Sequence, residues 1–373
     1  MKNKNFYNLS KLNKFVKNPK FKNCLIISGK KSFKLSGALK IFAQSNKITN
    51  LKNSIYFKKY FIPKLEEVTE IIKLIKKKKP SHIFAVGGGA SLDLAKSANL
   101  LSSSKNILRD IKKPRKDLKN YCNLIAIPTT AGSGAEVTSN SVVYIKNKKF
   151  SLEHKEIKPS TNLLVPDFVV KNKKSIKASA GFDAIAQAIE SIISMRSNSK
   201  SLTFATESLK ISFKNYINYI KNPNYNNSAK MLLASNLAGK AIDITKTTAP
   251  HAISYPFTFY YGVSHGHAVS LTLSEILSFN YQYKENSKKN FPLNDRFKLL
   301  FRISNTYNID NFVKLINYLK KKAGLSDKFK SLNIDIKRDI NKILLDVNPK
   351  RLANNPVELH KQDIKDLLLK KNS

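Results

Sequence analysis

Hydrophobic positions in the first 170 residues form short β-branched runs that alternate with segments of helical periodicity. The β-branched runs are CLIISG at 24–29, SIYF at 54–57, HIFAVGGG at 82–89 and LIAIPTTAG at 124–132. Helical patterns follow them, including PKLEEVTEIIKLIKKKK at 63–79 and ASLDLAKSANLL at 90–101. Strands that alternate with helices predict a parallel sheet with helices on both faces.

The pattern changes near Ser175, where the β-branched runs stop. Apolar residues then recur at helical spacing, in the segments 183–194, 201–220, 228–242 and 296–307. We therefore predict an α/β nucleotide-binding domain over residues 1–174 and an all-α domain over residues 175–373.

Composition adds expectations about the compartment. The 373 residues are 42% hydrophobic, and no apolar run approaches the length of about 20 residues that spans a bilayer. The amino-terminal stretch MKNKNFYNLSKLNKF lacks the apolar segment of a secretory signal. Cys24 and Cys122 lie in strand-like runs and are interpreted as reduced thiols. We expect a cytoplasmic protein that does not act on membranes.

The formal net charge of +42 raises the alternative of a nucleic-acid-binding protein. The excess is nearly all Lys, spread along the whole chain, with no Arg-rich stripe and no zinc-finger spacing. The densest run, Lys76–Lys79, precedes Pro80 and is typical of a solvated helix end. Nucleic acid is therefore not the expected main partner, and a general Lys bias explains the charge better.

Three consecutive glycines, Gly87, Gly88 and Gly89, lie between an apolar strand pattern and a helical pattern. Glycine lets the backbone approach an anion, and the N–H groups at a helix start attract phosphate. Leu92 stands where GxGxxG would have its third glycine, so this is not a standard Rossmann fingerprint. A tight strand-to-helix turn without a ligand is the alternative interpretation.

A second loop after a strand, IPTTAGSGAEVT, is rich in hydroxyl groups and small residues. Such groups suit contacts with ribose and phosphate. The residues concerned are Thr129, Thr130, Gly132, Ser133, Gly134 and Thr138.

The stretch KTTAPHAISYPFTFYYGVSHGHAVS contains His251, His265 and His267, which are half of the six histidines in the chain. They are candidates for metal ligands or for substrate-binding groups. Ordinary packed histidines are the alternative interpretation at this point.

The motifs GGGASLDLAK, PTTAGSGAEVT, GFDAIAQAIES, HAISYPFTFYYGVSHGHA and NNPVEL occur in the order found in the iron-containing (group III) alcohol dehydrogenases. The resemblance covers essentially the whole chain. It implies an NAD(P)-binding α/β domain and a helical metal and substrate domain, the architecture shared with dehydroquinate synthase. It further implies that Gly87–Gly89 hold the pyrophosphate, that Thr129 and Thr130 line the nicotinamide, and that Lys149 reaches the ribose. The other expected cofactor-binding residues are Ser91, Asp93, Ser133 and Thr138.

The resemblance also implies a metal site. Metal-dependent members have an Asp and a His four residues apart on one helix, followed by two His fourteen apart. Asp183, His251 and His265 match, but Gln187 stands where the first His is expected. An amide oxygen is a weaker ligand than imidazole for Fe(II) or Zn(II). We therefore expect a divalent ion, held less tightly because of Gln187, and a metal-free site is the alternative.

The expected catalytic residues are Lys246, Tyr255 and His267. Tyr255 stands where many members have another His, and it suits hydrogen bonding to substrate or proton relay, with packing as the alternative. Lys246, with Thr247, Thr248 and His267, suits an anionic group on the substrate. The alternative for Lys246 is one more solvated Lys.

The pattern TKTTAPHAISYPFT…HGHAVSLTL with Gln187 is most similar to the branch that reduces phosphonoacetaldehyde to 2-hydroxyethylphosphonate. Alternatives are a dehydrogenase of the same family that acts on another small aldehyde, and an enzyme like 3-dehydroquinate synthase. Gly29 follows the first strand, where NAD-selective members commonly have a carboxylate, and Lys30 and Lys31 come next. We expect NADP(H) to be accepted as well as NAD(H), and a homodimer or higher homo-oligomer.

Overall fold

The computed structural model describes residues 6–21, 23–44, 54–146 and 148–372. The chain divides into two compact units. The first contains the residues up to Asn172 together with Pro223–Asn236, and the second contains Lys173–Asn222 and the residues from Leu237 onward. The segment Pro223–Asn236 thus belongs with the first unit although it is distant from it in sequence.

A parallel five-stranded sheet forms the centre of the first unit. Its strand order is β2 (Ile55–Phe57), β1 (Cys24–Ser28), β3 (His82–Gly87), β4 (Asn123–Pro128) and β7 (Thr161–Asn162). Every pair of neighbours is parallel. The carboxyl ends of β1, β3 and β4 therefore lie at one edge, which is where α/β sheets bind ligands.

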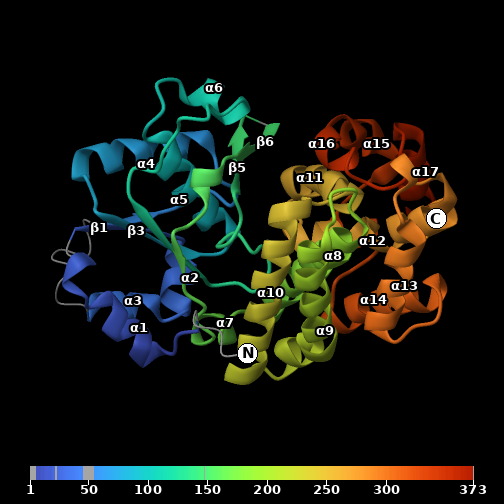
Figure 1. Ribbon diagram of the computed structural model, residues 1–373, viewed down its shortest axis with the longest axis horizontal. Helices are drawn as coiled ribbons and strands as arrows, with labels where there is room; N and C mark the ends of the chain where they lie inside the picture. The colour runs from blue at the N-terminus through green and yellow to red at the C-terminus, as the bar shows by residue number, and fades with distance from the viewer. Residues whose placement is uncertain (1–5, 22, 45–53, 147, 373) are drawn as a thin grey trace. The chain divides into compact units, whose positions relative to one another are not determined.

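Residues on each strand alternate between two apolar cores, because successive side chains point to opposite faces. On β1, Leu25 and Ile27 join the core under the helices α4 (Leu65–Lys78), α5 (Gly89–Leu101) and α6 (Ile107–Lys112). Cys24 and Ile26 join the core under α1 (Leu9–Val16), α2 (Lys30–Leu35), α3 (Ala38–Ala43) and α7 (Asp167–Val170). Figure 1 shows α4 and α5 on one face of the strands and α1 and α3 on the other. The predicted parallel sheet with two covered faces is confirmed.

An antiparallel hairpin, β5 (Asn140–Ile145) and β6 (Lys148–Glu153), stands outside this sheet and was not predicted from the sequence. It packs on α5, where the hydroxyls of Ser97 and Ser141 lie 2.7 Å apart. The short 3-10 helices of this unit are η1 (Pro19–Phe21) and η3 (Lys155–Ile157).

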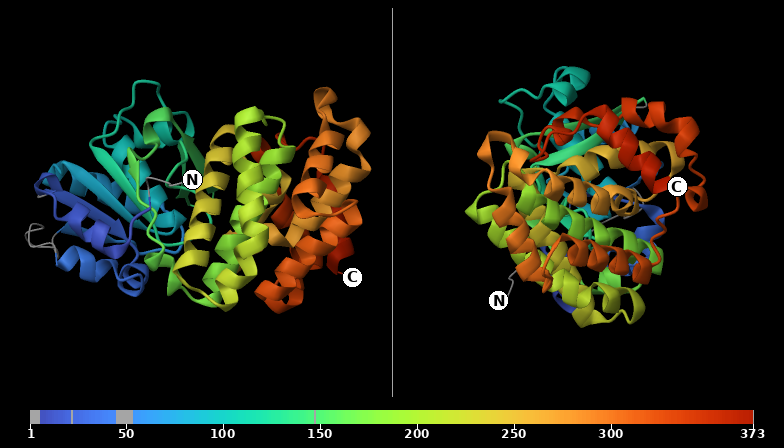
Figure 2. Two further views of the ribbon diagram at one scale, coloured as in Figure 1. Left: turned by 60° about the horizontal axis from the view of Figure 1, so that its bottom comes forward. Right: turned by 90° about the vertical axis from the view of Figure 1, so that its right-hand side faces the viewer.

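The second unit is helical, and no strand follows Asn162 in the part of the chain that the structure describes. Its α-helices are α8 (Lys174–Ile193), α9 (Ser199–Lys221), the end of α10 (Tyr225–Thr245), α11 (Ala249–Tyr261), α12 (His265–Gln282), α13 (Leu293–Ser304), α14 (Ile309–Ala323), α15 (Ile336–Leu345), α16 (Pro349–Leu352) and α17 (Lys361–Asn372). Its 3-10 helices are η4 (Lys284–Asn286), η5 (Lys288–Asn290) and η6 (Phe329–Leu332). Helix α8 packs on α9 and α12, and α12 packs on α11; the left view of Figure 2 shows α8 and α9 side by side in green and yellow-green.

No helix among the described residues is long and apolar enough to cross a membrane. Cys24 is buried and Cys122 is partly buried, and the two thiols are free. Burial raises the pKa of Cys24 to about 11 and that of Cys122 to about 12.

Candidate functional site

The three glycines form the turn between β3 and α5. Gly88 is the N-cap of α5, and it has extended backbone angles that any residue can adopt. What excludes a side chain is space: a Cβ on Gly87 would lie 2.6 Å from Ser91 Cβ, and one on Gly89 would lie 3.0 Å from Ser133 Oγ. Gly87 and Gly89 are therefore required for close packing around the helix start, where exposed N–H groups attract an anion.

The second loop lies directly against this turn. Thr129 N–H donates to Gly87 O at 2.9 Å, and a Cβ on Gly88 would touch Thr130 Oγ1 at 3.4 Å. The hydroxyls of Ser91 and Thr129 are buried and lack a hydrogen-bond partner among the described residues. Buried polar atoms are almost always satisfied, so these two fit a ligand that carries its own polar groups.

Lys96 holds the second loop in place from helix α5. Its ammonium group is fully buried and donates to Ala135 O at 2.9 Å, Thr138 O at 2.7 Å, Thr138 Oγ1 at 2.9 Å and Asn140 O at 2.6 Å. The hydroxyl of Thr138, an expected cofactor contact, is thus engaged with Lys96. We interpret Lys96 as an internal tie between the two loops and the hairpin.

Asp93 and Lys149, both expected to bind the cofactor, lie near each other in the first unit. Burial raises the pKa of Asp93 to about 6, while the charges of Lys96 and Lys149 and a hydrogen bond from the Val142 backbone lower it. Asp93 therefore also links α5 to the hairpin. Its contact with cofactor stays a prediction, as does that of Lys149.

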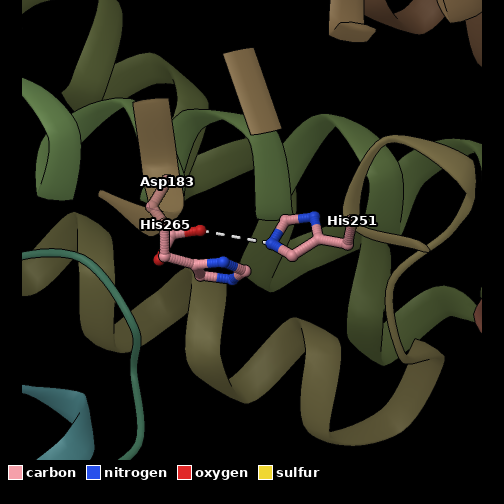
Figure 3. Close-up of side chains that lie close together, drawn as sticks. All are labelled: Asp183, His251 and His265. Carbon is pink, nitrogen blue, oxygen red and sulfur yellow. Dashed lines mark hydrogen bonds and ion pairs between the residues drawn. The ribbon is translucent and has the colours of Figure 1, made fainter. Parts of the chain in front are cut away.

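Asp183, His251 and His265 come together in the second unit. One ligand atom from each residue lies within 4.8 Å of the others, and the three side chains point toward one another in Figure 3. They come from three elements: Asp183 from α8, His251 from the first turn of α11, and His265 from the first residue of α12. Two imidazoles and one carboxylate are a donor set that suits Fe(II) or Zn(II).

Gln187 lies beside this cluster, one turn after Asp183 on α8. Its side chain hydrogen bonds to the Asp183 carboxylate, while its Oε1 is buried without a partner among the described residues. A buried unsatisfied amide oxygen costs free energy unless a ligand satisfies it. The four residues together therefore fit a divalent ion, with Gln187 Oε1 available as an additional oxygen donor.

The electrostatics of the cluster are dominated by burial and by its opposite charges. Burial alone lowers the pKa of His251, but the carboxylates of Glu190 and Asp183 outweigh it and raise that pKa to about 10. Burial raises the pKa of Asp183, but the hydrogen bond from His251 and the charge of His265 hold it below its ordinary value. His251 Nε2 lies 3.2 Å from Asp183 Oδ1.

Gly266 permits the close approach of α12 to α8 at the cluster. A Cβ at this position would lie 1.9 Å from Ser179 O and 2.8 Å from Asp183 Cβ. Those distances are far below van der Waals contact, so any larger residue would push the two helices apart. The glycine between His265 and His267 is therefore a packing requirement of the cluster of Asp183, His251 and His265.

Tyr255 and His267 have different surroundings. The Tyr255 ring stacks on His265, with centroids 6.2 Å apart and an interplanar angle of 27°. His267 lies two residues after His265 on α12, and residues with that spacing face different directions. The His267 ring accordingly has another partner, and its Nε2 donates to Ser326 O at 2.8 Å. Burial lowers the pKa of His267. Catalytic roles for both residues stay predictions.

Lys246 directly follows helix α10 and has the left-handed conformation, with φ 59°. Its ammonium group donates to Asp243 O at 3.1 Å. The backbone on either side is held firmly, because Asn354 Nδ2 donates to Thr245 O at 2.8 Å and to Thr247 O at 3.0 Å. The segment that was expected to hold a substrate anion is thus a clamped connection between α10 and α11.

Three residues with clear structural roles were not singled out from the sequence: Glu190, Lys96 and Asn354. Each lies inside a motif that carried the family resemblance, GFDAIAQAIES, GGGASLDLAK and NNPVEL. The available signal was a polar residue in an otherwise buried segment, which is expensive unless paired. A buried polar residue is expected to have a partner, but the sequence does not show which residue that partner is.

Comparisons with known proteins agree with this geometry. Residues 5–166 match the family of iron-containing alcohol dehydrogenases, and residues 177–372 match the C-terminal domain of the same family. A 4-hydroxybutyrate dehydrogenase of Clostridium kluyveri is 29% identical over 63% of this chain and 65% of its own length. A phosphonoacetaldehyde reductase of Streptomyces viridochromogenes is 30% identical over 53% of this chain and 52% of its own length. The chain thus matches roughly half to two thirds of the length of these curated relatives.

A solved structure extends the likeness to nearly the whole chain. The sulfoacetaldehyde reductase of Bifidobacterium kashiwanohense in complex with NAD+ has a TM-score of 0.83 and 25% sequence identity, covering 99% of this chain and 96% of its own. The fold class and the family resemblance predicted from the five motifs are confirmed. The chain belongs to the iron-containing alcohol dehydrogenase family.

Proposed function

We propose that the protein reduces phosphonoacetaldehyde to 2-hydroxyethylphosphonate, with hydride from a nicotinamide cofactor. The observation that carries the proposal is the cluster of Asp183, His251 and His265, in which Asp183 and His251 are buried and His265 is partly buried, in a chain of the iron-containing alcohol dehydrogenase family. Each unit supplies one part of the chemistry: the first has a turn suited to a dinucleotide, and the second has a donor set suited to a metal ion.

The metal proposal rests on the donor set and on the unpartnered oxygen of Gln187. Asp183, His251 and His265 would hold the ion, with Gln187 as a weaker oxygen donor. Such an ion supplies Lewis acidity, which polarises a carbonyl group. The surrounding helices exclude water from His251 and Asp183, which are each only 4% exposed, and this strengthens their electrostatic interactions.

The anionic substrate is supported by a shared feature of the three similar proteins. Their names specify phosphonoacetaldehyde, sulfoacetaldehyde and 4-hydroxybutyrate, and each of these compounds carries an anionic group. In this chain, Lys246 is the cation of the clamped segment that leads into α11. We assign the phosphonate to Lys246, because a charge-assisted hydrogen bond is stronger than a neutral one. Tyr255 and His267 are the proposed groups for substrate hydrogen bonding.

The test compares two aldehydes with Lys246→Ala. A hydrogen bond to a charged group contributes about 1.5–3 kcal/mol, which corresponds to a loss of about 10- to 150-fold in kcat/KM. We expect that loss for phosphonoacetaldehyde and little loss for acetaldehyde. Lys240→Ala removes a lysine from α10, the helix that directly precedes Lys246, and serves as the matched control.

An equal loss for both aldehydes would assign Lys246 to structure or to the cofactor. Wild-type activity that favours acetaldehyde would reject the phosphonate and leave the alternative of a family member acting on another small aldehyde.

Size-exclusion chromatography with light scattering tests the expected homodimer or higher oligomer.

For the cofactor, we propose that NADPH is accepted at least as well as NADH. The carboxyl end of β1 carries no carboxylate at Gly29, and three lysines border it: Lys30, Lys31 and Lys58. A Cβ on Gly29 would lie 3.4 Å from Lys58 Cε. Cations at this place favour a 2′-phosphate. Comparing kcat/KM for NADPH and NADH checks the proposal, and a clear preference for NADH would reject it.

A further inference from the structure

We propose that Glu190 is the positioning residue for His251: its carboxylate accepts the Nδ1 proton, so that Nε2 is the nitrogen available to the metal ion. This inference rests on the proposed metal site and deepens it. Glu190 does not belong to the ligand cluster itself, which contains Asp183, His251 and His265.

Among the described residues, the hydrogen bonds of the Glu190 carboxylate are directed at the start of α11. Its Oε2 contacts His251 Nδ1, and its Oε1 accepts from Thr248 N at 3.0 Å, from Thr248 Oγ1 at 2.9 Å and from His251 N at 3.4 Å. One carboxylate therefore holds both the ring of His251 and the backbone that carries it. A negative charge at a helix N-terminus is also favourable.

The position of Glu190 on α8 explains how it acts on the cluster. Asp183, Gln187 and Glu190 are spaced four and three residues apart, so they share one face of the helix. The helix that supplies the carboxylate ligand thus also supplies the group that orients the imidazole ligand. Glu190 is fully buried, and a buried carboxylate persists only when its oxygens are satisfied, as they are here.

The two ring nitrogens of His251 consequently have separate tasks. Nδ1 is committed to Glu190, while Nε2 faces Asp183 at 3.2 Å. A histidine ligand commonly donates its second N–H to a carboxylate, which fixes the tautomer and the ring orientation. Removing that carboxylate oxygen would let the proton move to Nε2, where it blocks coordination.

Glu190→Gln tests this directly, because an amide N–H facing Nδ1 favours the proton on Nε2. We expect the affinity for Co(II) or Zn(II), measured by chelator competition on the purified protein, to fall about 10- to 100-fold. Glu275→Gln, which neutralises a partly exposed carboxylate on α12 paired with Lys371, is the matched control and should bind metal like the wild type.

The variant Thr248→Val distinguishes two roles of Glu190: positioning the ring of His251, and capping the start of α11. It removes the hydroxyl that donates to Oε1 but leaves Oε2 on His251, so we expect nearly wild-type metal affinity. Equal losses in Thr248→Val and Glu190→Gln would overturn the proposal, since Glu190 would then only stabilise the helix start. Unchanged affinity in a folded Glu190→Gln variant would overturn it as well.

A measurement on the wild type needs no variant to fold. In the zinc-loaded protein, long-range 1H–15N correlation spectra should show the His251 proton on Nδ1 and the metal on Nε2. Zinc on Nδ1 would overturn the role of Glu190 while leaving the proposed metal site standing. A wild type that binds neither Co(II) nor Zn(II) would instead overturn the metal site, and the orienting role with it.

Discussion

The glycine turn of the first unit and the candidate metal-binding cluster of the second are built from different groups. The turn Gly87–Gly89 has no side chains, and the polar groups around it include backbone N–H groups and the hydroxyls of Ser91, Thr129, Thr130 and Ser133. The cluster consists of one carboxylate and two imidazoles within 4.8 Å of one another, packed at the junction of α8, α11 and α12. The first site depends on the absence of side chains, which leaves space for a ligand. The second depends on the orientation of its carboxylate and imidazole side chains.

This difference determines how each site fails. At the glycine turn, a side chain added at Gly88, where a Cβ would make only ordinary contact with Thr130, would occupy the place of the ligand while the fold persists. In the cluster, the aim of each ligand depends on helix packing, so a change there affects stability and binding together. Gly266 shows that the cluster also depends on the absence of a side chain, because a Cβ at this position would clash with Ser179 and Asp183.

The largest effect is expected for Gly266→Ala. The new Cβ would lie 1.9 Å from Ser179 O, so α12 must move away from α8 and carry His265 with it. Overpacking a close-packed interior costs about 1–3 kcal/mol and occasionally more, and this contact with rigid backbone places the loss near or above about 3 kcal/mol. Urea denaturation followed by circular dichroism measures it.

Gly88→Ala is the matched control for that experiment. A Cβ on Gly88 meets Thr130 Oγ1 at 3.4 Å, which is ordinary contact, so its free energy of unfolding should stay near that of the wild type. If both substitutions proved equally harmless to stability, the close packing of α8 and α12 inferred at Gly266 would be wrong.

A smaller effect, confined to binding, is expected for Gly88→Val. The two methyl groups extend beyond the Cβ that the turn tolerates, into the place where backbone must meet the pyrophosphate. We expect the cofactor Kd to rise at least about tenfold, a change of about 1.4 kcal/mol, with unchanged thermal stability. Fluorescence titration with NADPH measures this, and unaltered affinity in a folded variant would remove the pyrophosphate from this turn.

The smallest expected effect is a gain. Gln187→His replaces an amide oxygen by an imidazole nitrogen, the better ligand for Fe(II) or Zn(II). The gain is limited, since His loses the hydrogen bond that Gln187 makes to Asp183. We expect about tenfold tighter metal binding, or about 1.4 kcal/mol. Metal analysis after anaerobic Fe(II) loading decides the point, and negligible occupancy in both proteins would argue for a metal-independent site.

The sheet was predictable because its strands are short, continuous apolar runs followed by helices. Buried parallel strands have this pattern on both faces, and β1, β3 and β4 all follow it. The hairpin β5–β6 was missed because β6, Lys148–Glu153, is polar and only partly buried. Its pairing depends on contact with α5, which local pattern does not encode.

The candidate site was predictable only in part. The spacing of Asp183 and residue 187 places both on one helical face, but the meeting of His251 with His265 depends on how α11 and α12 pack. The family resemblance predicted that these two histidines lie together, whereas the residues that support them, Glu190 and Asn354, were not predicted. Glu190 and Asn354 act through partners that lie 58 to 160 positions away in the sequence, a separation that spacing rules do not reach.

The burial of Lys96 has a practical consequence in a chain so rich in lysine. Amine-reactive reagents modify solvent-exposed ammonium groups, whereas Lys96 in the first unit and Lys320 in the second are both fully shielded. Their labelling requires local opening of the structure around them. Mass-spectrometric labelling rates at these two positions would therefore follow the opening of each unit separately, against a background of many lysines that react at once.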